Sequence, residues 1–244
     1  MWKMRGVTTS LKHISLTIFS ILYPSFCPIC GNKSNSFSIS PICSQCWSEI
    51  KQYNGPSCNL CALPFISEKS VICGNCLKNK PLFKRVIAFG LYEDILKEAL
   101  SQFKFYGIRR LAKPLGNLLL TLNIPETDAI IPVPMTKKGL IRRGFNQSVL
   151  LGRAIACHKR IPLLTDVLFK IKETPPQVGL SASERLINLR GAFIAKGNLS
   201  RKSIILVDDV MTTGATVTEC TKVLLTQLPH KFLKKGLLKK ISST

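Results

Sequence analysis

Apolar and polar residues follow two different spacings over residues 83–228. Short apolar runs that end in glycine, proline or acidic residues predict buried strands. Longer segments between them carry apolar residues three and four positions apart, which predicts amphipathic helices; Pro114 interrupts one helix, and Asn146 is a suitable cap for another. Alternating strands and helices predict an α/β fold, with a mostly parallel sheet and helices on both faces. The predicted strands cover residues 85–92, 128–134 and 203–209, and the predicted helices cover residues 93–105, 108–122, 146–159 and 215–228.

Residues 24–82 show no such period. Proline, glycine, asparagine and serine separate pairs of cysteines there, which is typical of loops held together by metal ions. Eight of the 10 cysteines form four Cys-x-x-Cys pairs, and two pairs supply the four thiolates of a tetrahedral structural zinc site. We therefore predict a small module with two structural Zn²⁺ ions, in a reducing compartment. The simplest pairing places Cys27, Cys30, Cys43 and Cys46 on one ion and Cys58, Cys61, Cys73 and Cys76 on the other, and an interleaved pairing is the alternative.

Other roles for the cysteines fit the sequence less well. A thioredoxin-like redox role needs a Cys-x-x-Cys pair beside a βαβ unit, and the sequence supplies no such context. Cys157 and Cys220 lie in predicted helices, and we expect both to be small core residues.

Residues 1–23 begin with basic residues and continue into an apolar run at 14–23. This order resembles a signal peptide, but the run is too short to span a bilayer and no small-residue cleavage site follows it. The run also leads directly into the first cysteine pair. We therefore expect an amphipathic lead-in helix that packs on the cysteine module, with a signal or membrane anchor as the alternative.

The chain is strongly basic. Lysine and arginine number 35 against 13 aspartate and glutamate residues, which gives a formal net charge of +22 at pH 7. This charge favours polyanionic partners such as nucleic acid, phosphorylated metabolites or an anionic membrane surface. Phe103, Phe105 and Tyr106 would suit stacking on bases if they are exposed, and core packing if they are not.

The stretch SIILVDDVMTTGATVTEC, residues 203–220, has a specific chemical pattern. A strand that leads through a hydroxyl-rich loop into a helix N-terminus presents N–H groups and a helix dipole to a phosphate. Carboxylates repel phosphate, so Asp208 and Asp209 suit the vicinal hydroxyls of a ribose, or a divalent cation held with them. Neighbouring residues of a regular strand face opposite sides, so both acids reach one ligand only if the strand ends there. The alternative is an ordinary capped turn between a strand and a helix.

A second segment, IIPVPMTKKGLIRRGFNQ, covers another predicted strand and the basic residues after it. Open α/β sheets bind ligands at this end of their strands. Arg143 is suited to bind a phosphate group as a planar fork, with Gly144 and Asn146 shaping the loop. A solvated basic turn, with Asn146 as a helix cap, is the alternative.

These motifs, taken in order, resemble the ComF (competence protein F) family of type I phosphoribosyltransferase-like proteins. They are CPIC, CSQCW, CNLCALP and CGNC, then QFKFYG, IIPVPMTKKGLIRRGFNQS, ERLINLRGAF and ILVDDVMTTGAT, over roughly residues 20–228. The resemblance implies a type I phosphoribosyltransferase-like fold and an N-terminal zinc-ribbon module. It also implies that phosphoribosyl pyrophosphate (PRPP) binds with Mg²⁺. The family implies a cytoplasmic protein that works with DNA-uptake proteins on incoming single-stranded DNA during natural transformation.

The resemblance also implies roles for single residues. Asp208 and Asp209 would contact the ribose and, in an active enzyme, serve as catalytic residues. Lys104, Arg185 and Arg190 match family positions, although each alone is more typical of a surface charge. Salvage enzymes for 6-oxopurines carry an acid where Thr212 stands, so purine salvage is disfavoured. The implied PRPP-binding set is Lys104, Arg143, Gly144, Asn146, Asp208, Asp209, Thr212, Thr213, Gly214, Ala215 and Thr216.

Residues 229–244 depart from the family pattern, which continues into a glycine-containing turn and a further strand. Leu233, Leu237 and Ile241 are four apart beside lysines, which favours a short basic amphipathic helix that touches DNA or the membrane periphery. A terminus in solvent is the alternative. Without the further strand, the sheet would expose an edge.

The sequence leaves three functions open. The first is a PRPP-binding accessory protein of DNA uptake that binds single-stranded DNA through its basic surface. The second, compatible with the first, is an active phosphoribosyltransferase on an unidentified base or nucleotide. The third is a zinc-ribbon interaction module on a catalytically silent scaffold. The expected parts of the chain are the lead-in helix 1–23, the zinc module 24–82, the phosphoribosyltransferase-like domain 83–228 and the basic tail 229–244.

Overall fold

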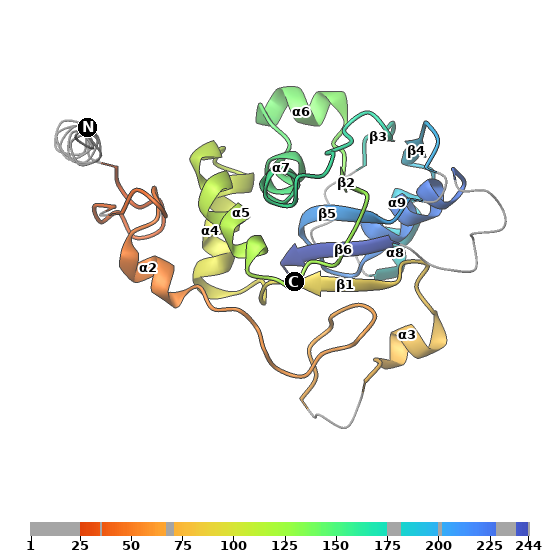
Figure 1. Cartoon of the computed structure of the whole chain (residues 1–244), viewed down its shortest axis with the longest axis horizontal. Helices are drawn as coiled ribbons and strands as arrows, with labels where there is room; N and C mark the ends of the chain where they lie inside the picture. The colour runs from red at the N-terminus through yellow and green to blue at the C-terminus, as the bar shows by residue number, and fades with distance from the viewer. Residues whose placement is uncertain are drawn as a thin grey trace, which may run out of the picture.

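The computed structural model describes residues 25–34, 36–66, 71–174, 182–199, 202–227 and 238–243. The expected lead-in helix at 1–23 lies outside these residues. Two cysteine modules precede a body in which helices surround a parallel sheet (Figure 1). Among the described residues, no helix has both the length and the apolar character needed to cross a membrane. The helices are α2 (Ser44–Glu49), α3 (Gly74–Lys78), α4 (Asp94–Lys104), the 3₁₀ turn η1 (Arg109–Leu111), α5 (Ala112–Leu120), α6 (Lys137–Arg143), α7 (Gln147–Lys159), α8 (Ala182–Leu189) and α9 (Ala215–Leu225), and the strands are β1 (Arg85–Ala88), β2 (Ala129–Pro132), β3 (Leu168–Lys170), β4 (Phe193–Ala195), β5 (Ile204–Val210) and β6 (Leu238–Ser243).

Four parallel strands form the main sheet, in the order β1-β6-β5-β2. Alternate residues of β5 face opposite sides. Ile205 and Val207 lie in one core with residues of α4, α5 and α7, whereas Ile204 and Leu206 lie in a second core with residues of α8 and α9. Figure 1 shows these two groups of helices on different sides of the strands. The predicted α/β architecture, with a parallel sheet covered on both faces, is confirmed.

Strand β6 lies in the middle of this sheet. Lys240 is in register with Val86 of β1 and with Leu206 of β5. The expectation of a basic helix is therefore wrong for residues 238–243. These residues form a further strand of the sheet, which their sequence pattern did not indicate. A four-residue spacing favours a helix when the segment is considered alone. Here two strand edges offer backbone partners on both sides, and tertiary context overrides that local pattern.

The sequence pattern did not indicate α6, α8 or the antiparallel pair of β3 and β4. These elements are only three to eight residues long, too short to show a hydrophobic period. Helix α6 is instead fixed by its two ends. Thr136 Oγ1 accepts a hydrogen bond from the Gly139 N–H at 3.0 Å, and Gly144 ends the helix with a φ of +79°.

Several local predictions can be compared with the structure directly. Asn146 caps α7, because its Oδ1 accepts from the backbone N–H groups of the first turn, as predicted. Pro114 lies in the first turn of α5, where a missing N–H costs no helical hydrogen bond, and the irregularity precedes it at η1. Cys220 is buried as predicted. Cys157 is exposed, so the core expectation is wrong for it: its side of α7 faces away from the sheet.

The two cysteine modules pack on the body in different ways. Cys27, Cys43 and Cys46 of the first module belong to the same apolar core as α4 and α5. The second module has a small core of its own and runs along β1, where the Val86 N–H donates to the Leu60 carbonyl at 2.8 Å. The second module therefore covers part of the edge that β1 would otherwise expose.

Candidate functional site

Each cysteine module gathers four thiols at one point. Within each cluster the Sγ atoms all lie within 4.8 Å of one another. A tetrahedron of Zn–S bonds about 2.3 Å long needs sulfur atoms about 3.8 Å apart. This donor set fits two structural zinc ions, and the cysteines are grouped as in the simplest pairing, not the interleaved one. The clusters are Cys27, Cys30, Cys43 and Cys46, and Cys58, Cys61, Cys73 and Cys76.

Backbone N–H groups favour the thiolate form that zinc requires. The Cys73 N–H, for example, points at Cys58 Sγ from 3.3 Å. Burial raises the pKa of the Cys27 and Cys58 thiols, but the surrounding N–H donors outweigh burial and lower each pKa to about 7. Each cluster thus contains one thiol that ionises readily at neutral pH.

Asp208 and Asp209 lie near the end of β5 and are 9% and 7% exposed. The strand does not end at these acids, as the sequence analysis required for both to reach one ligand, but continues to Val210. Its register against β6 shifts between Val207 and Val210, and both acids line one cavity. Ser148 Oγ donates to Asp208 Oδ1 at 3.1 Å. This register shift in the strand therefore lets both acids line one cavity, which the sequence analysis had expected a strand end to do.

Lys104, the last residue of α4, pairs with one of these acids. Its Nζ lies 3.0 Å from Asp209 Oδ2. Burial raises the pKa of Asp209, but the charge and hydrogen bond of Lys104 outweigh burial and hold that pKa below its ordinary value. Burial likewise lowers the pKa of Lys104, and the two acids outweigh it and raise that pKa. Lys104 is therefore not a simple surface charge: it keeps Asp209 ionised within the site.

Phe105 and Arg143 lie beside this ion pair. The Phe105 ring is 65% exposed, and Lys104 Nζ and Arg143 Cζ lie 5.9 and 6.0 Å from its centre. Arg143 Nη1 donates to Gln147 Oε1 at 3.0 Å, which orients the guanidinium. Phe103, in contrast, is fully buried. Of the neighbouring aromatic residues, Phe105 thus places an exposed ring on the cavity wall.

The loop 212–216 connects β5 to α9. Gly214 has a φ of +76° and is the N-terminal cap residue of the 11-residue helix α9. Arg185 Nη1, from α8, donates to Thr212 Oγ1 at 2.7 Å. Arg185 therefore reaches the loop and is more than a surface charge, whereas Arg190 is exposed and lies outside the cavity lining.

Gly144 and Asn146 shape the corner between α6 and α7. Asn146 caps α7 and also donates from Nδ2 to the Val133 carbonyl at 3.0 Å, which ties this corner to the residue after β2. Both residues line a neighbouring groove, whereas Arg143 lines the cavity that contains the acids. In the structure, Gly144 and Asn146 therefore hold the segment that carries Arg143 in place.

One cavity of about 750 Å³ brings most of the predicted residues together. Its walls combine three acids, Asp208, Asp209 and Glu173, with cationic side chains and the start of a helix, and its volume suits a ligand of nucleotide size. The sequence analysis missed Lys170, Glu173 and Phe193, because the β3–β4 pair was not predicted, and it missed Tyr92, which it treated only as the end of a predicted strand. The predicted residues that line the cavity are Lys104, Arg143, Asp208, Asp209, Thr212, Thr213, Gly214, Ala215 and Thr216.

Similarity to known proteins agrees with this arrangement. Residues 18–77 match the family model described as a double zinc ribbon domain. Over 198 residues the chain is 35% identical to competence protein F of Haemophilus influenzae, which covers 75% of this chain and 83% of that protein. The chain belongs to the ComF family. Other ComF relatives are the DNA utilization protein YhgH of Salmonella typhi, 32% identical over 83% of this chain and 91% of its own, and competence protein ComFC of Bacillus subtilis, 29% identical over 75% and 78%.

Among solved structures, this ComF chain is similar to a glutamine PRPP amidotransferase from B. subtilis complexed with ADP and GMP. The similarity covers 52% of this chain and 25% of that chain, with 21% identity and a TM-score of 0.35. A similarity of this size carries no argument about ligands, so the chemistry of the site rests on its own residues.

Proposed function

We propose that this ComF-family chain binds PRPP in the cavity beside β5 and binds single-stranded DNA in support of DNA uptake. The observation that carries the first part is the shared cavity of Asp208, Asp209, Lys104, Arg143 and the loop 212–216. The names of the relatives, competence protein and DNA utilization protein, support the second part. A type I phosphoribosyltransferase-like fold belongs to the same proposal, and it is supported by a parallel sheet whose ligand residues gather at the carboxyl ends of β2 and β5.

The loop 212–216 is the proposed site of the 5′-phosphate. The N-terminus of α9 offers backbone N–H groups and a positive dipole end. Gly214 has no side chain to hinder close approach of the phosphate, and the hydroxyl groups of Thr212, Thr213 and Thr216 supply further donors. Arg185 adds a positive charge to this end of the cavity.

The two acids are the proposed ribose contacts. Asp209 is held ionised by Lys104, so it can accept hydrogen bonds from the 2′ and 3′ hydroxyls. Lys104 and Arg143 are positioned to bind the pyrophosphate, since both flank the acids on the cavity wall. The carboxylates, together with PRPP oxygens, form a donor set of the kind that Mg²⁺ prefers, and the ion would neutralise pyrophosphate charge when bound.

PRPP binding is tested by calorimetric titration of PRPP with Mg²⁺ into the unaltered protein and into Asp208→Asn/Asp209→Asn. The matched control is Glu126→Gln/Asp166→Asn, which removes two exposed acids outside the cavity. We expect the site variant to bind at least about tenfold more weakly, because each acid makes charge-assisted hydrogen bonds, and the control to bind normally. Equal affinity in all three proteins would reject the site.

The DNA-binding part rests on charge as well as on the relatives. A net charge of +22 predicts association with single strands that weakens steeply as salt rises, with little sequence preference. Binding that does not change with salt would reject it. Eight of the ten cysteines form the two clusters that suit zinc, and such thiolate sites persist in a reducing compartment, so we propose a cytoplasmic location.

A second candidate is an active phosphoribosyltransferase. The exposed Phe105 ring favours it, because a flat acceptor base can stack there beside the proposed PRPP site. The acceptor atom would attack the anomeric carbon, the carbon–oxygen bond to pyrophosphate would break, and pyrophosphate would leave. The measurement is pyrophosphate release from PRPP with a panel of bases and nucleotides, using Asp209→Asn as the control. Release that continues at an unchanged rate in this variant rejects the candidate.

A further inference from the structure

A groove of about 990 Å³ lies next to the PRPP cavity. Residues of α6, α7, β3 and β4 form its walls, and it shares Pro134, Lys170 and Glu173 with the cavity. The shared residues make the two spaces neighbours, so one elongated ligand could extend from one into the other. The groove has no role in the proposed PRPP contacts.

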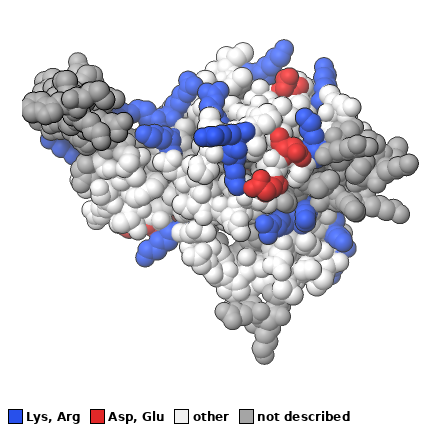
Figure 2. Space-filling view, viewed as in Figure 1, with Lys and Arg blue, Asp and Glu red and all other residues white. Residues whose placement is uncertain are grey.

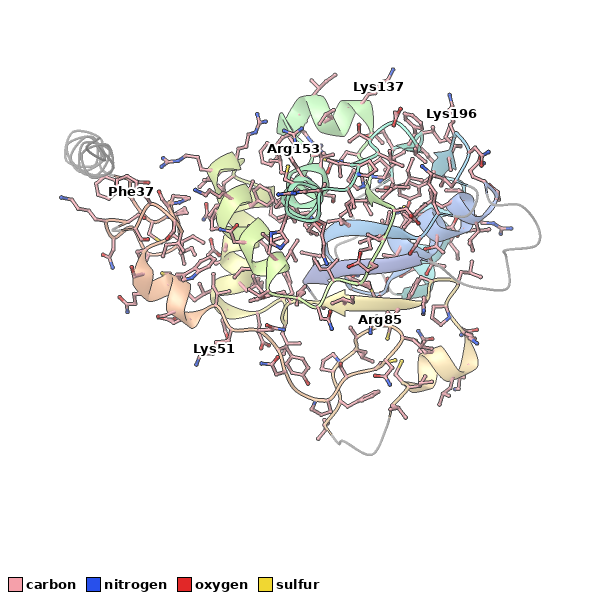
Figure 3. All side chains as sticks on the ribbon, viewed as in Figure 1. Phe37, Lys51, Arg85, Lys137, Arg153 and Lys196 are labelled. Carbon is pink, nitrogen blue, oxygen red and sulfur yellow. The ribbon has the colours of Figure 1, made fainter. Side chains whose placement is uncertain are left out.

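The charged residues that line the groove are almost all basic. Figure 2 shows basic side chains spread over much of one face of the molecule, so charge alone does not single out a surface. Within the groove, however, η1, α6, α7, β3 and the residue after β4 all contribute cations, and Glu173 is the acid among the described lining residues. Figure 3 shows Lys137, Arg153 and Lys196 on three separate elements. The cations are Arg109, Lys137, Lys138, Arg153, Lys170 and Lys196.

The cations are available to a ligand. In the part of the chain that the structure describes, Lys137, Lys138, Arg153 and Lys196 are all at least partly exposed and none of them forms a salt bridge. Cations that converge on a concave surface without acidic partners repel one another, and a polyanion relieves that repulsion. The groove therefore fits a ligand with several negative charges spaced along it.

Apolar surface lies between these charges. Phe169 lines the groove, with Lys196 Nζ 5.6 Å from its ring centre. Leu140 and Ile171 also line it and are 44% and 60% exposed. Proteins that bind single strands combine a positive groove with aromatic and apolar faces that contact unstacked bases. A duplex hides those base faces, so the apolar surface selects for a single strand.

We propose that this groove is the binding track for the single-stranded nucleic acid, and that it leads the strand toward the PRPP cavity. The proposal rests on the DNA-binding part of the proposed function and gives it a location. Lys137, Arg153 and Lys196 bind backbone phosphates, and Phe169 stacks on a base. Binding of PRPP does not depend on these residues.

The first test compares two triple variants that lose the same charge. Lys137→Gln/Arg153→Gln/Lys196→Gln alters the groove, and Lys51→Gln/Lys97→Gln/Lys113→Gln removes three exposed lysines elsewhere. Affinity for a fluorescent oligonucleotide is measured by anisotropy over a range of salt concentrations. We expect the groove variant to bind about tenfold or more weakly, with a log–log salt slope smaller by about 2, since each lost phosphate contact removes about 0.7. An equal loss of oligonucleotide affinity in both triple variants would overturn the proposal that the strand binds in this groove.

The second test addresses base contact. Phe169→Leu keeps apolar volume but removes the aromatic face, and we expect about tenfold weaker binding of the oligonucleotide with little change for an abasic strand of the same length. Equal weakening of both strands, or equal affinity of the unaltered protein for duplex and single strand, would overturn the base contact. If the unaltered protein binds no oligonucleotide, the DNA part of the proposed function fails together with the groove. PRPP titration of the same samples reports the PRPP part separately.

Discussion

Lys104 Nζ lies 3.0 Å from Asp209 Oδ2, so a cation is already paired with the acid at the centre of the candidate site. The two residues belong to α4 and β5, which are distant in sequence. The core that the sheet shares with α4, α5 and α7 brings them together. An acid that keeps its charge while buried needs such a partner. The ion pair thus links the stability of the fold to the chemistry of the site.

Replacement of Lys104 by Met should change how stability depends on pH. In the unaltered protein the pKa of Asp209 is lowered, so its contribution is present above the ordinary value of 3.8 and is lost as pH falls through the lowered pKa. Without Lys104, burial raises the Asp209 pKa, and stability is lost at higher pH, by about 3 kcal/mol near neutrality. Denaturant unfolding between pH 3 and 8 measures this. Lys97→Met, on the exposed face of the same helix, should behave normally, and parallel pH profiles of the two variants would contradict the prediction.

Gly214→Ala should damage the loop. Gly214 has a φ of +76°, and an added Cβ would lie 3.3 Å from Met211 Cε. The positive φ and the close contact with Met211 together should cost about 1–3 kcal/mol of stability. The distorted loop should also bind PRPP more weakly. Gly74→Ala is the matched control, because Gly74 lies outside the left-handed region and a Cβ added there would meet no atom within 4 Å. Thermal melting and calorimetry report the two effects, and similar results for both variants would argue against the strain.

The two zinc clusters should differ in their effect on the body of the protein. Cys43→Ser weakens a cluster that shares its core with α4 and α5, so we expect the Tm of the whole body to fall by about 10 °C, or about 3 kcal/mol in a chain of this size. Cys73→Ser alters the cluster beside β1, whose core is separate, and should mainly increase aggregation through the uncovered strand edge. Metal analysis should give two zinc ions per unaltered chain. Identical melting curves for the two variants would show that the modules are equivalent.

A proline within β6 should be poorly tolerated. Ile241 is in register with Ile87 on one side and Val207 on the other. Proline lacks an N–H and cannot complete a ladder in a central strand, so Ile241→Pro should lose about 3 kcal/mol or more of unfolding free energy. Circular dichroism with denaturant titration measures the loss. A variant as stable as the unaltered protein would contradict the central position of β6.

Much of the site could be predicted from residues 203–216, because a buried strand, two acids and a small loop follow one another directly. Each feature is local, and each has a short-range physical signature. Arg143 was grouped with the acids from its place after a neighbouring strand, whereas Lys104 was grouped with them only through motif resemblance. Arg185 was undervalued, since nothing local distinguishes a long cation that reaches a loop from one in solvent.

The remaining features depend on contacts between distant segments. Strand β6 is defined by the two strands beside it, so its own residues 238–243 gave no reliable signal. The β3–β4 pair has three residues in each strand, which is too short for any period to be recognised. The irregularity that aims Asp208 and Asp209 at one cavity also arises from pairing with β6. The unpredicted strand β6 and the expectation that β5 ends at Asp208 and Asp209 therefore had the same cause.

The position of β6 also affects how the protein folds while it is being synthesised. Ribosomes release the chain from its N-terminus, so β1, β2 and β5 emerge before the strand that separates β1 from β5. Until residues 238–243 arrive, the facing edges of β1 and β5 remain open, and either edge can capture another chain. The nascent protein should therefore need protection by chaperones late in synthesis, and a translation product interrupted before β6 should be found in aggregates rather than in a partly active form.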